Sequence, residues 1–399
     1  MRIGFVGPFS SRDNSDYGSG KQVGAIEQQL FALGVELTKL GNEVYLSRNW
    51  EGDEEEEVVE GVHLVNVNLF ATTAQGFYDA GFPLGRISQV YYILRAPTRL
   101  RRNDLDVLVA PGVLPAFVSS LTSRKSGVPA VFVANNNDIF VHQGGGHTKI
   151  RFATQMMIDA ISRRYDATIA LTRGGQEYLQ SLGLHCSAVI PNAVYPQKYQ
   201  CRAEEGFILT AGRLVPHKRV EDLLIAFSAV CKEIPERLVI IGSGPGETSI
   251  KRFVANLGIQ TRVRLQPFLP QATYRDWLSR CSFFVLPSEA EAFGVSIIEA
   301  MACGKPVIAR DTIGPKDIIT PDQDGYLFRS PAELSRQIKM LSRDGDLRSR
   351  LGRNARETVR GRYTFEDIAM QYQALLSSVH QSKHRTSGKR NRVEDGKRK

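Results

Sequence analysis

The sequence has no long apolar run: no stretch approaches the ~18 apolar residues in a row that suggest a membrane-spanning helix. We expect no cleavable leader either, because Met1 and Arg2 lead directly into an apolar strand, Ile3 to Val6. Cysteine is scarce, and the five cysteines form no C-x-x-C pair. The sequence therefore predicts a cytoplasmic protein with reduced thiols and no disulfide framework.

Signatures of a metal site are also sparse. D-x-D strings occur at 104–106, 322–324 and 344–346, but a chain with 42 acidic residues contains such strings by chance. No further ligand residues accompany them, so we predict that no metal is bound.

The conventional phosphate loops are missing too. Gly18-Ser19-Gly20-Lys21 is glycine-rich, but a P-loop would need Gly at Ser15 and Ser or Thr at Gln22. A dinucleotide fingerprint would need its glycines directly after the strand and a third at Val23. Both of these common nucleotide-binding motifs are therefore excluded at this position.

What the chain does have is length and an ordinary globular composition. At 399 residues, with 42% apolar and 23% charged residues, it is long enough for two domains with their own cores. The formal charge is +9, of which residues 381–399 supply +6 from eight Lys/Arg against two acids, which leaves +3 for the rest. We expect this basic tail to be disordered and solvated, with peripheral contact to an anionic membrane as an alternative; we do not expect nucleic acid as a partner.

The first half reads as alternating strands and helices. After the strand Ile3 to Val6, apolar residues recur at helical spacing from Val23 to Leu40, and a strand follows at Glu43 to Leu46. Further strands are predicted at Val107 to Ala110 and Ala130 to Ala134. This is the pattern of an α/β fold with a doubly wound parallel sheet.

The second half is organised around the stretch from Phe283 to Arg310, which reads as strand, polar loop, short helix and strand. Glu291 precedes the helix and Glu299 lies on it, so their backbones are roughly 12 Å apart at ~1.5 Å rise per residue. This exceeds the 5–9 Å typical of a carboxylate pair acting on one bond. The spacing favours two contacts along an extended ligand, with the helix N-terminus between them as a seat for phosphate.

Two more segments of this half end strands with glycines and cations. The strand Phe207 to Thr210 leads into Gly212-Arg213, and Lys218 follows before a helix. The strand in RLVIIGSGPGE leads into a turn that contains Gly242, Gly244 and Gly246.

The motifs PSEAEAFGVSIIEAMACGKPVIA, GRLVPHKRVEDLL and PNAV together resemble the retaining glycosyltransferases of family 4, which have the GT-B fold. The resemblance implies that Glu299 holds the ribose hydroxyls and that Glu291 faces the transferred sugar. It also implies that the backbone of Phe293, Gly294 and Val295 approaches the sugar and phosphates.

The resemblance assigns further roles. Arg213 and Lys218 would clamp the diphosphate, and Gly212, Gly242 and Gly244 would border the nucleotide. Gly18 and Gly20 would face the donor phosphate and acceptor, with a plain helix-entry turn as the alternative. Asn136 and Asp138 would contact acceptor or sugar, with an ordinary loop start as the alternative.

This chain departs from the family pattern in several places. Ala292, Ala193 and Arg219 stand where glycine is common. Many members have a histidine near the Asn run at 135–137, whereas here the nearest is His142. The residue that would take its place near the reacting carbon is not evident from the sequence.

We therefore predict a GT-B protein of two Rossmann-like domains facing a cleft. The expected segments are an acceptor domain at 1–194, a donor domain at 195–362, a helix at 363–380 that returns to the first domain, and the tail at 381–399. The expected activity is retaining transfer of a sugar from a UDP- or GDP-type donor to a glycan, lipid-linked or small-molecule acceptor, with no cofactor. A GT-B nucleotide-sugar epimerase and a non-catalytic protein that binds sugar nucleotides or nucleic acid are the alternatives.

Overall fold

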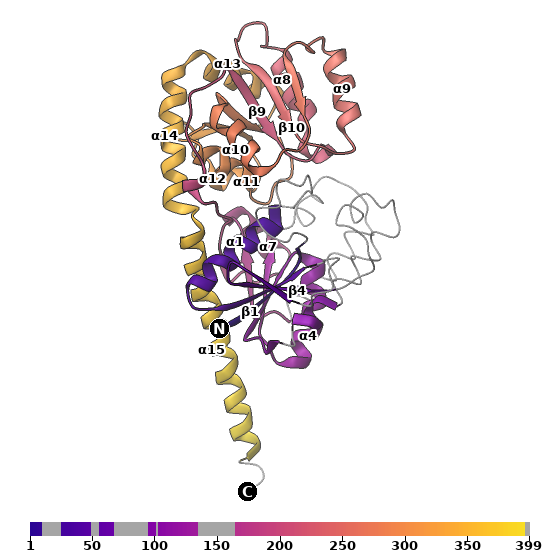
Figure 1. Cartoon of the computed structure of the whole chain (residues 1–399), viewed down its shortest axis with the longest axis vertical. Helices are drawn as coiled ribbons and strands as arrows, with labels where there is room; N and C mark the ends of the chain where they lie inside the picture. Colours follow the sequence, from indigo (N-terminus) through magenta and orange to yellow (C-terminus); the bar gives the residue numbers. More distant parts are fainter. Residues whose placement is uncertain (10–24, 49–55, 68–94, 101–102, 135–163, 396–399) are drawn as a thin grey trace. The chain divides into compact units, whose positions relative to one another are not determined.

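The computed structural model describes residues 1–9, 25–48, 56–67, 95–100, 103–134 and 164–395, and these residues form two compact units (Figure 1). The first unit comprises the described residues up to Ile190 together with those from Phe365 onward. The second comprises Pro191–Thr364.

The first unit is built on a sheet of eight strands in the order β3-β4-β2-β1-β5-β6-β7-β8. All neighbouring strands are parallel except β3 and β4, which are antiparallel. The strands are β1 (Arg2–Phe9), β2 (Glu43–Arg48), β3 (Glu56–Val59), β4 (Val62–Asn66), β5 (Val107–Pro111), β6 (Ala130–Ala134), β7 (Ala167–Ala170) and β8 (Ala188–Val189). The central strands β5, β6 and β7 are buried along their whole length, which explains why β5 and β6 read as continuous apolar runs.

The helices of this unit are α1 (Ala25–Lys39), α4 (Val113–Ser126), α7 (Arg173–Ser181) and α15 (Phe365–Asp395). The C-terminal helix α15 packs against α1, as expected for a helix that returns to the first domain (Figure 1). The side chain of Gln373 accepts a hydrogen bond of 2.6 Å from Asn42, and Lys383 pairs with Asp166 at 2.9 Å. The helix continues to Asp395, beyond the expected end at residue 380, because no proline interrupts a segment rich in Lys and Arg.

The second unit has a fully parallel six-stranded sheet in the order β11-β10-β9-β12-β13-β14. Its strands are β9 (Phe207–Ala211), β10 (Arg237–Ile241), β11 (Val263–Gln266), β12 (Phe283–Leu286), β13 (Val307–Arg310) and β14 (Gly325–Phe328). When the strands are numbered within the unit, with β9 as the first, their order across the sheet is 3-2-1-4-5-6. Successive strands are therefore added on one side of β9 as far as β11 and on its other side from β12 onward, so the order reverses between β9 and β12. Ligands of such sheets bind beyond the carboxyl ends of the strands at this switch point.

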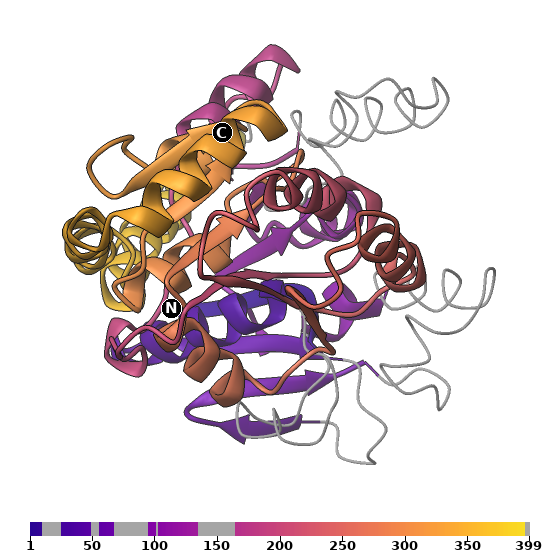
Figure 2. The ribbon, with the colours of Figure 1, turned by 90° about the horizontal axis from the view of Figure 1, so that it is seen from above.

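Helices cover both faces of this sheet (Figures 1 and 2). They are α8 (Val220–Ser228), α9 (Glu247–Asn256), α10 (Gln271–Arg280), α11 (Val295–Ala302), α12 (Pro315–Ile318), α13 (Pro331–Arg343) and α14 (Gly345–Arg362). α8 packs against α9 and α13, whereas α11 packs against α10, α12 and α14. Local signals start the last two helices: the hydroxyl of Ser330 caps α13 by accepting from the N–H of Glu333, whose carboxylate accepts from the N–H of Arg329, and Asp344 caps α14.

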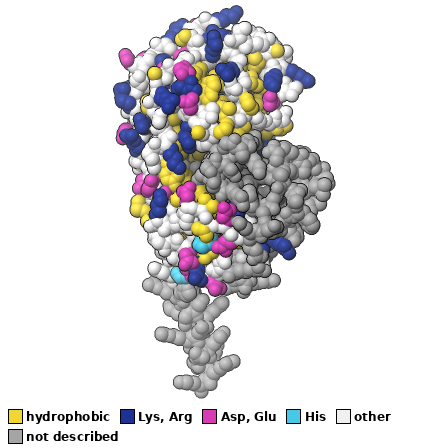
Figure 3. Space-filling view, in the orientation of Figure 1, with side chains coloured by type: hydrophobic (Ala, Val, Ile, Leu, Met, Phe, Trp, Pro, Cys, Tyr) yellow, Lys and Arg dark blue, Asp and Glu magenta, His cyan; other side chains and the backbone are white. Residues whose placement is uncertain are grey.

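Charges on the described surface are mixed rather than segregated by sign. Figure 3 shows Lys and Arg side chains interspersed with Asp and Glu on the visible face. Lys339 and Arg343 both pair with Glu233, and Arg348 pairs with Glu204. Among the helices that the structure describes, none is both long and apolar enough to span a bilayer.

Candidate functional site

A pocket lies at the switch point of the second sheet, where β9 and β12 end. It is bordered by the segment after β9, by Lys218 and by the start of the loop after β12. The lining residues are Thr210, Ala211, Gly212, Arg213, Leu214, Lys218, Val220, Ile240, Leu286, Pro287 and Ser288. Three of the residues expected to bind the donor, Gly212, Arg213 and Lys218, are therefore brought to one place.

The side chains of Lys218 and Glu291 form an ion pair in this region. The Nζ of Lys218 donates to Oε2 of Glu291 at 2.7 Å, and the two side chains are only 20% and 13% exposed. Lys218 ends a 3-10 helix, η5 (Pro216–Lys218), and Glu291 lies in the loop before α11. Two residues that the sequence placed in separate roles are thus in direct contact across 73 positions.

The loop that carries Glu291 is held at three backbone positions. The guanidinium of Arg310, at the end of β13, donates to the carbonyl of Pro287 at 2.8 Å. The N–H of Glu289 donates to the carbonyl of His217 at 3.0 Å, and the N–H of Gly314 donates to the carbonyl of Glu291 at 3.0 Å. Neighbouring βα loops of one sheet edge therefore fix the position of the Glu291 carboxylate.

A buried carboxylate, Asp222 on α8, organises the cations beside this loop. It accepts hydrogen bonds from Arg219 at 3.0 and 3.1 Å and pairs with Arg310, which in turn holds Pro287. Arg219 has a left-handed backbone with φ of 49°, which explains why glycine is common at this position. In this chain the ion pair with Asp222 offsets part of the strain of a side chain there.

His217 adds an ionisable group that the sequence reading did not single out. Burial, together with the neighbouring Lys218 charge, lowers the pKa of His217 below its ordinary value of 6.5. Glu291 and Glu289 oppose this change, whereas Arg213 reinforces it. The imidazole is therefore neutral at physiological pH and adds no further positive charge to this cationic edge.

Glu299 occupies the middle of α11 and is nearly buried, with 8% of its surface exposed. Its Oε1 accepts hydrogen bonds from the hydroxyl of Tyr199 and from the amide of Gln271, both at 3.0 Å. Burial raises the pKa of Glu299, and hydrogen bonds from Tyr199, Gln271 and Tyr274 oppose that rise. A carboxylate with defined partners can accept further hydrogen bonds from ligand hydroxyls in a fixed orientation.

The segment Phe293 to Val295 starts α11. The ring of Phe293 is buried and packs edge-to-face on Tyr363, with centroids 5.8 Å apart, so its side chain belongs to the core. Gly294 has φ of 107° at the N-cap, and a Cβ there would lie 2.8 Å from Ile297. Only the backbone of this segment and the half-exposed Val295 are therefore available for a ligand.

The glycine turn after β10 has a packing role of its own. A Cβ on Gly242 would lie 1.9 Å from the carbonyl oxygen of Gly212, and one on Gly244 would lie 2.6 Å from that of Leu214. The N–H of Gly246 also donates to the carbonyl of Leu214 at 2.9 Å. These glycines let the turn after β10 lie directly against the segment after β9, whatever further part they take in binding a nucleotide.

Four of the candidate site residues are not among those that the structure describes. Gly18, Gly20, Asn136 and Asp138 lie outside the described residues.

The D-x-D strings have structural partners. Asp106 accepts a hydrogen bond from the N–H of Arg2, and Asp344 accepts one from the N–H of Leu347. Asp324 accepts from the N–H of Thr320 and from the hydroxyl of Thr358. Within the ranges that the structure describes, no three His, Cys, Asp or Glu side chains are grouped as metal ligands.

Sequence reasoning missed Tyr199, Gln271, Asp222, Arg310 and Gly314. A Gly-Pro pair at 314–315 indicates a turn and could have identified Gly314 as a position of close backbone approach. The other four carry no local signal, because their partners lie on other strands and helices.

The chain matches the models of two glycosyltransferase families and several curated relatives. The model of "Glycosyltransferase Family 4" matches residues 26–198, and that of "Glycosyl transferases group 1" matches residues 192–358. A D-inositol 3-phosphate glycosyltransferase of Frankia alni is 32% identical over 83% of this chain and 87% of its own length. An N-acetyl-alpha-D-glucosaminyl L-malate synthase of Bacillus anthracis is 31% identical over 46% of this chain, which spans only 48% of that protein.

Solved structures share the fold. Sucrose-phosphate synthase from Thermosynechococcus elongatus superposes with a TM-score of 0.80 at 19% identity, covering 96% of this chain and all of that one. Anabaena HepE, solved in complex with UDP and glucose, gives 0.73 at 18% identity over 95% of this chain and all of its own. Two Rossmann-like parallel-sheet units confirm the expected GT-B fold class. The family matches and the Frankia alni relative together show that the chain belongs to the family 4, or group 1, glycosyltransferases.

Proposed function

We propose that this chain transfers a sugar from a nucleotide-sugar donor to an acceptor hydroxyl, with retention at the anomeric carbon and without a metal. The observation that carries the proposal is the Lys218–Glu291 pair beside the switch-point pocket. It brings together a cation for the leaving diphosphate and a carboxylate for the transferred sugar.

The reaction requires stabilisation of charge on the departing diphosphate. Arg213 is exposed at the pocket and Lys218 is half-buried beside it, so both cations can face the phosphate oxygens. Cations held in place by protein contacts stabilise developing negative charge better than solvated ones. In the retaining course, the acceptor attacks from the same face, and the leaving diphosphate helps to remove the acceptor proton.

The carboxylates would take different parts of the donor. Glu291, held by Lys218 and by the backbone contact to Gly314, would position the sugar or offset positive charge at its anomeric carbon. Glu299 would accept hydrogen bonds from the ribose hydroxyls. Hydrogen bonds to an ionised carboxylate are roughly twice as strong as neutral ones, which suits a contact that anchors the nucleotide.

Among donors, the UDP type has support from HepE, which has been solved with UDP and with UDP-glucose. The GDP type expected beside it is kept in the test below. For the acceptor, the names of the two relatives mention L-malate and D-inositol 3-phosphate, which supports the small-molecule class among the three expected acceptor classes. Peripheral membrane contact through residues 381–399 stays a prediction that rests on charge alone.

The donor is identified by thermal unfolding with UDP-glucose, GDP-mannose and ADP-glucose, for the wild type and for Glu299→Ala. A ligand at ~100 times its Kd adds about 2.7 kcal/mol to the stability of the folded state. We expect a raised midpoint with one base in the wild type and a much smaller rise in the variant. If none of the three nucleotide sugars raises the midpoint, the proposed donor site is wrong.

Kinetics then test the catalytic assignments with that donor. We expect Arg213→Ala, Lys218→Ala and Glu291→Ala each to lower kcat by on the order of 10²–10³. Lys251→Ala is the matched control, because Lys251 forms an exposed ion pair with Glu247 on α9. Wild-type kcat in the three site variants would contradict the assignment.

A further inference from the structure

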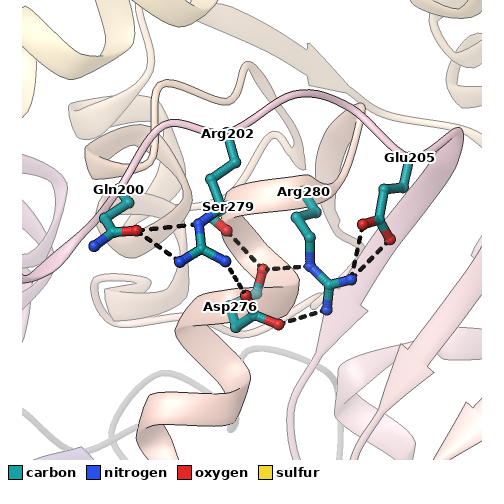
Figure 4. A network of polar contacts seen from close by, with 6 residues as sticks. All are labelled: Gln200, Arg202, Glu205, Asp276, Ser279 and Arg280. Atoms are coloured by element: carbon teal, nitrogen blue, oxygen red, sulfur yellow. Dashed lines mark hydrogen bonds and ion pairs between the residues drawn. The ribbon is translucent and has the colours of Figure 1, made fainter.

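Residues 200–205, which precede the second sheet, are held against α10 by ion pairs and hydrogen bonds. Arg202 pairs with Asp276 on α10 at 2.7 Å, and its N–H donates to the carbonyl of Ser279 at 3.2 Å. Glu205 accepts two hydrogen bonds from Arg280, at 2.8 and 2.9 Å, and Arg280 also pairs with Asp276 (Figure 4). Residues 200–205 are therefore held along α10 by several charged contacts.

Tyr199, directly before these contacts, turns inward to α11. Its side chain is buried, with 5% exposed, and its hydroxyl donates to Oε1 of Glu299 at 3.0 Å. Gln271, the first residue of α10, donates to the same oxygen at 3.0 Å. Two donors from two different segments thus converge on one carboxylate oxygen.

We propose that Tyr199 is a positioning residue for nucleotide binding: its hydroxyl holds the Glu299 carboxylate in the orientation that receives the ribose hydroxyls. This inference rests on the proposed function, since it needs a nucleotide whose ribose contacts Glu299. It makes the connecting segment a part of the donor site, although its sequence carries no motif.

The flexibility of a glutamate side chain explains why donors to its carboxylate are needed. A glutamate side chain has three rotatable bonds, and a terminal carboxylate rotates freely unless its oxygens are bonded. The two donors to Oε1 restrict the rotation of the carboxylate before the ligand arrives, which lowers the entropic cost of binding.

Charge acts in the same direction. Besides Tyr199 and Gln271, the groups that face Glu299 include Tyr274 and Arg275 of α10, which lower its pKa, and the thiol of Cys303. The hydroxyl of Tyr199 opposes the rise that burial causes in the pKa of Glu299, and so favours the ionised form that accepts ribose hydroxyls.

The test compares a nucleoside diphosphate with its 2′,3′-dideoxy analogue by calorimetric titration, using whichever of UDP, GDP and ADP the wild type binds. We expect the wild type to bind the ribose form about 10-fold or more tightly than the analogue, because the hydroxyls bond to a charged group. In Tyr199→Phe that ratio should fall at least about threefold, because the carboxylate is no longer held. Tyr326→Phe is the matched control, since its hydroxyl faces Asp322 on the far edge of the same sheet.

The outcomes separate the two proposals. Equal weakening of both ligands in Tyr199→Phe, with the ratio unchanged, would show a merely structural role and overturn the inference while the donor site stands. A wild type that binds none of the three diphosphates would overturn the proposed function, and the inference with it. Gln271→Met removes the other donor to Oε1, so the same loss of ratio is expected there and provides a second measurement if Tyr199→Phe does not fold.

Discussion

Replacing Gly314 with alanine would test how strictly the Glu291 loop must be placed. Gly314 precedes α12 with φ of −72°, so its backbone conformation is open to any residue. The obstacle is space: a Cβ would lie 2.4 Å from the carbonyl oxygen of Phe293 and 2.6 Å from that of Glu291. Ordinary contact begins near 3.4 Å, so the loop must move by about 1 Å.

Such a movement should cost both stability and activity. Forcing an extra methyl group into a packed site costs about 1–3 kcal/mol of the free energy of unfolding. A displacement of about 1 Å at a catalytic group lowers kcat/KM by roughly 10²-fold. We therefore expect Gly314→Ala to fold with a lowered midpoint and to release nucleotide from the donor about 10²-fold more slowly than the wild type.

A matched control separates crowding from the substitution itself. Gly361, near the end of α14, has nothing within 4 Å of an added Cβ. Gly361→Ala should keep wild-type kcat/KM and gain at most about 1 kcal/mol from helix propensity. Wild-type activity in Gly314→Ala would refute the argument that the contact between these two loops sets the position of Glu291.

Two further predictions concern stability. Burial raises the pKa of Glu27 on α1 from 4.5 to about 7, so the folded state holds this proton more tightly than the unfolded chain. Stability should therefore fall as pH rises from about 4.5 to about 7, by about 3 kcal/mol at ~1.4 kcal/mol per pH unit. Chemical denaturation should show Glu27→Gln more stable than the wild type at pH 8 by about this amount, with no gain at pH 4; a constant difference across the range would contradict it. At Arg219, both Arg219→Gly and Arg219→Ala lose the ion pair to Asp222, but only glycine relieves the left-handed backbone. We expect the glycine variant to be about 1 kcal/mol more stable than the alanine variant in urea unfolding, and equal stabilities would show that the backbone there is not strained.

Much of the fold could be predicted because buried parallel strands carry a strong local signal. The runs that became β6 and β12 are apolar at every position and are buried on both faces of their sheets. The end of α15 was harder to place, because charged residues with high helix propensity suit both a solvated helix and a disordered tail.

The candidate site could be predicted only where its members are neighbours in the chain. The spacing of Glu291 and Glu299 is visible in one stretch, and so is the step from Gly212 to Lys218. The contact of Lys218 with Glu291 depends on the pairing of β9 with β12, which places distant loops at one sheet edge. The same holds for Tyr199 on Glu299, across 100 positions.

The glycine turn after β10 shows a different limit. Three glycines within five residues are weak evidence for phosphate binding when read from sequence alone. The structure adds a second reason for them, because the turn lies against the backbone of residues 212–214 with no room for side chains. A pattern that suits a ligand can also be required by the packing of two loops.

The ends of the second unit lie side by side: Val194 and Thr364 form a parallel bridge, and the N–H of Val194 donates to the carbonyl of Tyr363 at 2.9 Å. A segment whose two ends meet in this way can be inserted into a host chain, or removed from it, with little distortion of either part. Residues 191–364 are therefore suited to exchange between relatives as one unit. Such an exchange would move the second sheet, its pocket and the Tyr199–Glu299 contact together, while the flanking residues that form the other sheet would change independently.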